Sequence, residues 1–165
     1  MAGTYDPITS LTLSSAVSSY TFNNIPQTYT DLVLVAIAQR GLSNSGGAGT
    51  LTLNGDTGSN YSSTILYGDS GAAYSYRWSN QTVMYGAFAA GDSENNINVI
   101  SFLNYSNATT YKTVLSRMGW VNTNGRVTAG VNLWRSTAAI TSITLSAANN
   151  IASGSTFALY GVKAA

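Results

Sequence analysis

Three side chains that carry oxygen atoms lie close together in the segment Leu51–Thr64, which reads LTLNGDTGSNYSST: Asn54, Asp56 and Asn60. Oxygen ligands spaced along a glycine-rich loop are the kind that bind Ca²⁺. The EF-hand spacing is not met, because the twelfth position counted from Asn54 is Ile65, where that loop needs a bidentate glutamate. The alternative is a turn whose Asn-Gly and Thr-Gly pairs supply positive-φ positions and whose polar side chains bond nearby backbone N–H groups. We favour the turn and expect no metal and no cofactor.

Nucleophilic and metal chemistry is limited by composition, because the chain has no histidine and no cysteine. Ser-His-Asp, Cys-His and ordinary zinc sites are therefore excluded, and no disulfide can form. A phosphate-binding P-loop is also excluded, because neither of the two lysines, Lys112 and Lys163, ends a Gly-x-x-x-x-Gly-Lys pattern. Asp92 and Glu94 would share one face of an extended chain, but GDSENN reads as a solvated loop rather than a glycosidase pair. We expect no enzymatic activity.

Aromatic side chains are the other group that could bind a partner, since the chain has 11 tyrosines. Trp134 is expected on the polar, outward face of its strand, so its burial would need a second sheet or a partner. Exposed tyrosine and tryptophan serve protein interfaces and sugar stacking, and they also pack ordinary β-sheets. Both interpretations stay open for the candidate interface residues, which are Tyr61, Tyr67, Tyr74, Tyr76, Trp78, Trp134 and Arg135.

The elements that must position these residues are predicted to be strands. Val127, Ala129 and Val131 alternate with polar or small residues, a period of two that is typical of half-buried strands. Residues 32–38 are apolar at every position, which predicts a central strand covered on both faces, by another sheet or a neighbouring subunit. Turn-forming pairs separate the expected strands, which are 7–13, 18–23, 32–38, 49–54, 62–68, 82–88, 97–104, 111–120, 127–133, 142–147 and 156–163.

The 165 residues fit one domain, and 44% apolar residues are enough for a core. With no segment of sustained helical period, we expect a single all-β domain over 1–165, a jelly-roll-like antiparallel β-sandwich of about ten strands. Residues 86–90 are too short and too close to glycine to predict a helix. Nothing in the N-terminal sequence resembles a signal peptide, and no apolar run is long enough to span a membrane.

Charge is scarce, since charged residues are 8% of the chain against roughly 25% in an average domain. The net charge of +1 gives no reason to expect nucleic-acid or membrane-surface binding. The distribution is uneven, because residues 1–94 carry a net −4 and residues 95–165 carry +5. Either the two halves mix their charges within one fold, or complementary patches meet between subunits.

Several segments resemble structural proteins of marine tailed bacteriophages. The segments are Asn54–Ser62, Tyr111–Val114, the run LWRSTAAITSITL over 133–145, and the ending Gly154–Lys163. Residues 1–29 match less distinctly, and residues 79–96 match no pattern of that family. The resemblance implies a virion component without catalytic residues, a β-sandwich module carried on heads or tail fibres and expected as a homotrimer.

Two functions follow from the resemblance. The first is a capsid decoration, or cement, protein on the outside of the virion, made in the host cytoplasm and bound to the major capsid protein. The second is the receptor-binding tip of a tail fibre, in which Tyr74, Tyr76 and Trp78 stack on a host surface glycan. The absence of a shaft or anchoring region in the sequence favours the first function.

Overall fold

The computed structural model describes residues 4–41, 49–69, 71–91, 94–120 and 125–163, and these form strands and loops without a helix. Strands are the expected outcome of the period of two, because alternate side chains then point to opposite faces of a sheet. Twelve strands are described: β1 (Tyr5–Thr12), β2 (Val17–Phe22), β3 (Asp31–Ala38), β4 (Thr50–Leu53), β5 (Tyr61–Asp69), β6 (Ala72–Gln81), β7 (Met84–Tyr85), β8 (Asn96–Leu103), β9 (Lys112–Trp120), β10 (Arg126–Trp134), β11 (Ile143–Ile151) and β12 (Thr156–Val162).

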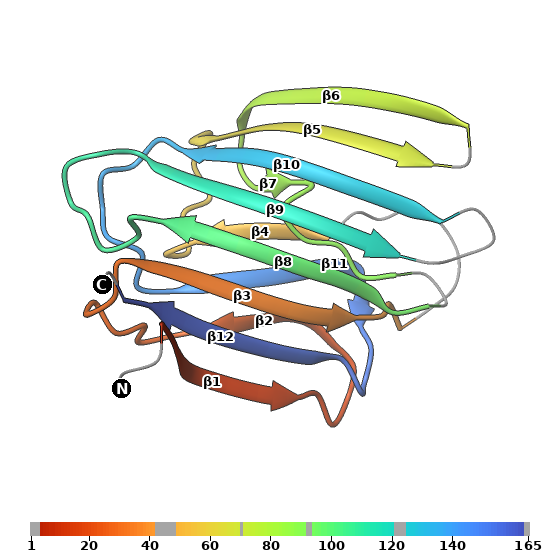
Figure 1. Cartoon of the computed structure of the whole chain (residues 1–165), viewed down its shortest axis with the longest axis horizontal. Helices are drawn as coiled ribbons and strands as arrows, with labels where there is room; N and C mark the ends of the chain where they lie inside the picture. The colour runs from red at the N-terminus through yellow and green to blue at the C-terminus, as the bar shows by residue number, and fades with distance from the viewer. Residues whose placement is uncertain (1–3, 42–48, 70, 92–93, 121–124, 164–165) are drawn as a thin grey trace.

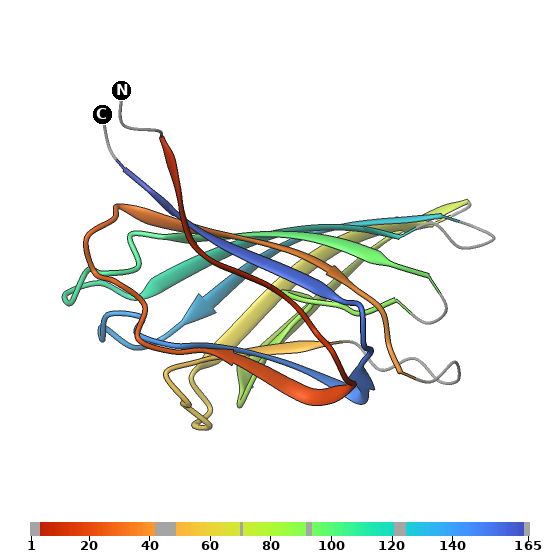
Figure 2. The same cartoon turned by 90° about the horizontal axis from the view of Figure 1, so that it is seen from below.

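The strands form two antiparallel sheets that face each other (Figures 1 and 2). The large sheet has the order β1-β12-β3-β8-β9-β10-β5-β6, and the small sheet has the order β2-β11-β4-β7. From β1 to β4 the chain alternates between the sheets, and β11 and β12 return between those strands, which is the connectivity of a jelly roll. The expected all-β, jelly-roll-like antiparallel sandwich is confirmed, with twelve strands in place of about ten.

Two inserted hairpins make the sheets unequal. β5–β6 follows β4, and β9–β10 follows β8, and both hairpins add to the same end of the large sheet. The large sheet therefore extends past the small one, and β6 forms its far edge (Figure 1). This extension carries most of the aromatic residues singled out from the sequence.

The core lies between the two sheets. Leu32, Leu34 and Ala36 of β3 are fully buried, as are Leu51 and Leu145 of the small sheet. The expectation of a central strand at 32–38 is confirmed, because β3 pairs with β12 on one side and β8 on the other. No described part of the chain forms a second layer over the opposite face of β3.

The face that β10 turns to the core is the reverse of the predicted one. Thr128, Asn132 and Trp134 are buried, whereas Val127 is 65% exposed and Val131 is 46% exposed. The period of two was right and the choice of face was wrong, because alternation alone does not say which set of side chains points inward. The polar inward face has a structural cause in the segment that covers it.

That covering is residues 86–91, called here the crossing segment, where a strand over 82–88 was expected. Only Met84–Tyr85 is a strand, because the chain then leaves the small sheet and crosses the inner face of the large one. Side chains of the large sheet bond its backbone: the Asn98 Oδ1 accepts from Ala89 N at 2.9 Å, and the Ser116 Oγ donates to Gly86 O at 3.0 Å. Buried backbone needs such partners, which explains Asn98 and Ser116 in this part of the core.

Close approach of the crossing segment requires small residues beneath it. A Cβ on Gly130 of β10 would lie 2.6 Å from Ser116 Oγ and 3.1 Å from Gly86 O. Gly86 itself has φ of 68° and leaves no room for a side chain beside Ile65. Gly130, which looks outward in the sequence, thus leaves the space that admits this segment.

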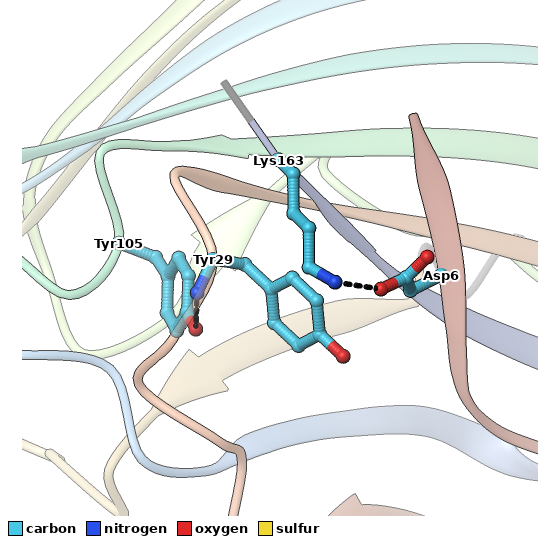
Figure 3. A network of polar contacts seen from close by, with 4 residues as sticks. All are labelled: Asp6, Tyr29, Tyr105 and Lys163. Atoms are coloured by element: carbon cyan, nitrogen blue, oxygen red, sulfur yellow. Dashed lines mark hydrogen bonds and ion pairs between the residues drawn. The ribbon is translucent and has the colours of Figure 1, made fainter. Parts of the chain in front are cut away.

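The N-terminal and C-terminal strands are fastened to each other at one end of the large sheet (Figure 3). Lys163 Nζ lies 2.5 Å from the Asp6 carboxylate and 5.7 Å from the centre of the Tyr29 ring. The Tyr29 ring lies against Gly161, and its backbone N–H donates to the Tyr105 hydroxyl at 3.4 Å. The Asp6–Lys163 pair joins an acidic residue of the first half to a basic residue of the second.

Candidate functional site

The Asn54–Asn60 loop is a rigid corner between the two sheets. Asn54 and Gly55 both have positive φ, 53° and 65°, and Asp56 N donates to Leu53 O at 2.9 Å, which defines a type I′ turn. Asn54 Oδ1 accepts from the backbone N–H groups of Thr141 and Ser142 at 2.8 and 3.0 Å. The Asn-Gly pair therefore acts as the sequence predicts.

Gly58 does not use positive φ, contrary to the expectation for the Thr-Gly pair. Its N–H donates to Asp56 Oδ1 at 2.8 Å, and a Cβ there would lie 2.8 Å from Asn60 Nδ2. The glycine is needed for space around the Asp56 carboxylate rather than for backbone freedom.

Asp56 is the acceptor that holds this corner to the large sheet. Its Oδ2 accepts from Trp134 Nε1 at 2.7 Å and from Asn60 Nδ2 at 2.9 Å. Partial burial acts to raise the pKa of Asp56, but the hydrogen bonds from Trp134, Asn60 and Gly58 outweigh it and hold the pKa below its usual value. The carboxylate is thus committed to protein donors, an arrangement that favours a structural corner over a calcium site.

Tyr61 and Trp134, two of the candidate interface residues, are core residues in this chain. Tyr61 is fully buried, Trp134 is 2% exposed, and their rings stack 6.5 Å apart. The Tyr61 hydroxyl donates to Asp56 O at 3.0 Å, and burial raises its pKa to about 12. Trp134 is buried by its own chain, so neither ring is available to a partner.

Arg135 and Lys112 also fasten loops. Arg135 donates from Nη1 to Ser62 Oγ at 2.8 Å and from Nη2 to Ser59 O and Asn80 Oδ1, at 2.5 and 2.9 Å. Lys112 is buried, and its Nζ donates to Thr110 O at 2.6 Å and Thr137 O at 3.2 Å. Its desolvation lowers the pKa of the amine. Sequence reasoning missed Lys112, because nothing in its neighbourhood marks a buried cation.

The carboxylates that the structure describes give no catalytic pair. Asp92 lies outside the described residues, and Glu94 is exposed. Asp6 is in an ion pair, and Asp31 accepts from Asn104 N at 2.6 Å. Among the described residues no three metal-binding side chains come together, and no helix there could cross a membrane.

The remaining candidates form an aromatic row at the extended end of the large sheet. Tyr67 of β5 stacks on Tyr74 and Tyr76 of β6, with ring centres 4.9 and 5.7 Å apart, and Arg126 lies 3.7 Å from the Tyr67 centre. Tyr76 continues the row to Trp78 at 5.8 Å. The row follows the alternation at 74, 76 and 78, the signal in the sequence that could have identified β6 as a strand.

The aromatic row lies beyond the cover of the small sheet, so Tyr74 is 43% exposed and Tyr76 is 46% exposed. Neighbouring rings face one another at angles of 5° to 24° within the row. A sugar-stacking platform needs ring faces that are free to lie against a pyranose. This geometry uses ring faces between neighbours and so gives little support to glycan stacking along the row.

Among the described residues, exposed apolar side chains gather on the outer side of the large sheet. The surface they form spans five adjacent strands, β3, β8, β9, β10 and β5, whose outward positions pair across the sheet, as Ile37 with Ile97 and Val131 with Leu115. We call it the outer apolar face. Its most exposed members, at 39% to 65% exposure, are Ile37, Leu66, Ile97, Leu115, Val127 and Val131.

The outer side of the small sheet has the opposite character. Thr144 of β11 pairs with Thr21 on one side and Thr52 on the other, and Ser146 pairs with Ser19 and Thr50. Hydroxyls cover this surface, and Thr21 and Thr144 bond each other at 2.9 Å. Hydroxyl groups suit contact with water. An apolar outer surface is therefore a property of the large sheet and is not shared by the small sheet.

No protein-family model matches the chain, and no curated protein matches it. One matching solved structure is the crystal structure of a protein of unknown function from Shewanella oneidensis MR-1. It is 12% identical, with 99% of this chain and 77% of that chain covered, and the TM-score is 0.27. A likeness at that level carries no argument about fold or function.

Proposed function

We propose that the chain is a non-enzymatic structural protein of a phage virion, a capsid decoration protein that docks on the assembled head through the outer apolar face. The observation that carries the docking is the reversal of β10, which presents Val127 and Val131 to the outside. The virion location rests on the resemblance of the sequence segments described above.

The size of the outer apolar face supports docking. Five strands spaced about 4.8 Å apart and about 30 Å long have a footprint of about 700 Å², polar positions such as Arg117 included. A specific interface of standard size buries about 800 Å² on each partner, which is close to this footprint. The face is therefore large enough to hold a partner protein.

Arg117 indicates which kind of partner fits. It lies on β9 in the middle of the outer apolar face, opposite Ala129 on one side and Val99 on the other. No described carboxylate pairs with it. Two copies meeting about an axis at this point would oppose two cations, which costs free energy, so a different protein with an apolar surface and a carboxylate is the better complement.

The mechanism of such a protein is mass action. A subunit that binds only the assembled lattice stabilises it by RT ln(1 + [L]/Kd) per site, about 2.7 kcal/mol at 100 times Kd. The function needs no chemical step, only a surface that fits the closed lattice. A homotrimer, expected from the resemblance, remains a prediction that light scattering checks.

The test is co-sedimentation of the purified protein with heads from the phage that encodes it, with mass spectrometry of the intact particles. We expect abundant copies on the particle and binding that falls at least tenfold in Val131→Lys and in Arg117→Glu. Ser19→Lys, on the hydroxyl-covered side, is the matched control and should bind as the unaltered protein does. Absence from the particle would overturn the function, and binding unchanged by Val131→Lys and Arg117→Glu would overturn the docking face.

A further inference from the structure

The edge strand β6 is long, and most of it is unprotected. From Ala72 to Trp78 every residue pairs with β5, the register then shifts before Gln81, and the other side of β6 forms the end of the large sheet. Proteins usually protect such an edge with proline, lysine or a bulge, because its free N–H and C=O groups pair readily with another strand. Between Ala72 and Trp78 the strand has no proline, lysine or bulge, and one charged residue, Arg77.

The opposite edge of the same sheet is protected. β1 contains Pro7, which has no N–H to donate, and its register with β12 shifts between Pro7 and Thr9. Each edge strand has one register shift, but only β1 contains a proline, and β6 keeps an uninterrupted run from Ala72 to Trp78. The unprotected edge is also the one that carries the aromatic row.

We propose that β6 pairs antiparallel with β6 of a second copy of this chain, so that the two large sheets join into one. The contact is a surface distinct from the outer apolar face, and it holds whether or not the chain binds a capsid. The partner strand comes from a second copy because the sequence of β6 is complementary to itself when the two-fold axis passes through Tyr76.

In that register each aromatic residue meets another. Tyr76 lies opposite Tyr76 of the second copy, and Tyr74 lies opposite Trp78, so the aromatic row continues across the junction. Aromatic pairs directly opposite each other stabilise antiparallel strands. Arg77 lies opposite Ser75, so the register avoids an Arg–Arg pair, whereas an axis at Arg77 would create one.

The test uses cysteine, which the chain lacks. A single Tyr76→Cys places two thiols directly opposite, with Cα atoms about 4.5–5.5 Å apart, within the range that a disulfide spans. Ala73→Cys is the matched control, because that residue lies opposite position 79 and about 20 Å from its own copy. We expect oxidised dimer to form at least tenfold faster in Tyr76→Cys, and equal rates would overturn the proposal.

A charge exchange gives a second measurement that does not depend on a disulfide. Tyr76→Lys and Tyr76→Glu each oppose like charges at the axis, so each alone should sediment with half the mass of the unaltered protein at concentrations where the unaltered protein associates through β6. Mixing the two should restore the pair, as measured by sedimentation velocity. An unaltered protein that stays monomeric, or a trimer whose mass neither variant changes, would overturn the contact without affecting the capsid-binding test.

Discussion

At the scale of single residues, Asp56 joins two parts of the molecule that are far apart in the sequence. Its carboxylate accepts from Gly58 and Asn60 within its own loop and from Trp134 at the end of β10. Trp134 is almost fully buried, and a buried donor that loses its partner costs free energy, so its indole N–H depends on Asp56. The loop that looked like a cation site is therefore a connection between the β4–β5 corner and the large sheet.

Asp56→Asn should destabilise the protein by about 1–3 kcal/mol at neutral pH, the cost of leaving a buried donor poorly paired. Because folding lowers the pKa of Asp56, its contribution is fully present above the ordinary value of 3.8 and is lost as pH falls through the folded pKa. Urea unfolding at pH 7 and pH 3 should show a smaller difference between the two proteins at pH 3. The exposed Glu94→Gln is the control, and a difference that persists unchanged in acid would contradict this assignment.

At the scale of elements, the crossing segment decides which face of the large sheet is the core face. Asn98 supports it with one donor and one acceptor, because its Nδ2 donates to Ala89 O and its Oδ1 accepts from Ala89 N, both at 2.9 Å. The same amide reaches Ala36 O and Asn96 O, at 3.3 and 3.2 Å. A single side chain thus satisfies backbone groups from three segments.

Asn98→Leu keeps a similar volume and removes these hydrogen bonds, so it should cost about 2–4 kcal/mol through two unpaired backbone groups. Denaturant unfolding measures the loss, and hydrogen exchange should show the Ala89 amide losing its protection. Ser101→Leu, a polar-to-apolar change on the outer side of the same strand, should stay within about 0.5 kcal/mol. Retained protection at Ala89 in Asn98→Leu would show that the crossing segment is held by other contacts.

At the scale of the whole molecule, the sandwich is closed where its first and last described strands meet. Tyr29 lies over Gly161 of β12, and Lys163 extends beside Tyr29 to Asp6 of β1 (Figure 3). A Cβ on Gly161 would fall 2.3–2.5 Å from ring atoms of Tyr29, closer than any real contact. The partly buried ring packs on a buried glycine, whereas the ion pair beside it is more exposed to water and salt.

Gly161→Ala should therefore lower the melting temperature clearly, by the equivalent of about 1–3 kcal/mol of overpacking. Lys163→Ala should change it little, because exposed ion pairs contribute little. Thermal unfolding of the two variants side by side makes the comparison, with added salt as a check on the ion pair. If the melting temperature falls further in Lys163→Ala than in Gly161→Ala, the ion pair contributes more to stability than the packing of Tyr29 on Gly161.

The sequence by itself determined the strand content, the antiparallel sandwich and the Asn54–Gly55 turn, because these depend on local alternation and on turn chemistry. It also identified the tyrosine-rich stretch, although the expected strands did not include β6, where Tyr74, Tyr76 and Trp78 alternate.

Only the tertiary structure decided which side of β10 is inside. Val127 and Val131 look like core residues and are exposed, whereas Trp134 looks outward and is buried. The physical reason is that a strand has two equivalent faces, and the choice between them is made by what packs on it from elsewhere. In this chain the crossing segment needs space beneath it, so β10 turns Gly130 inward and leaves Val127 and Val131 exposed.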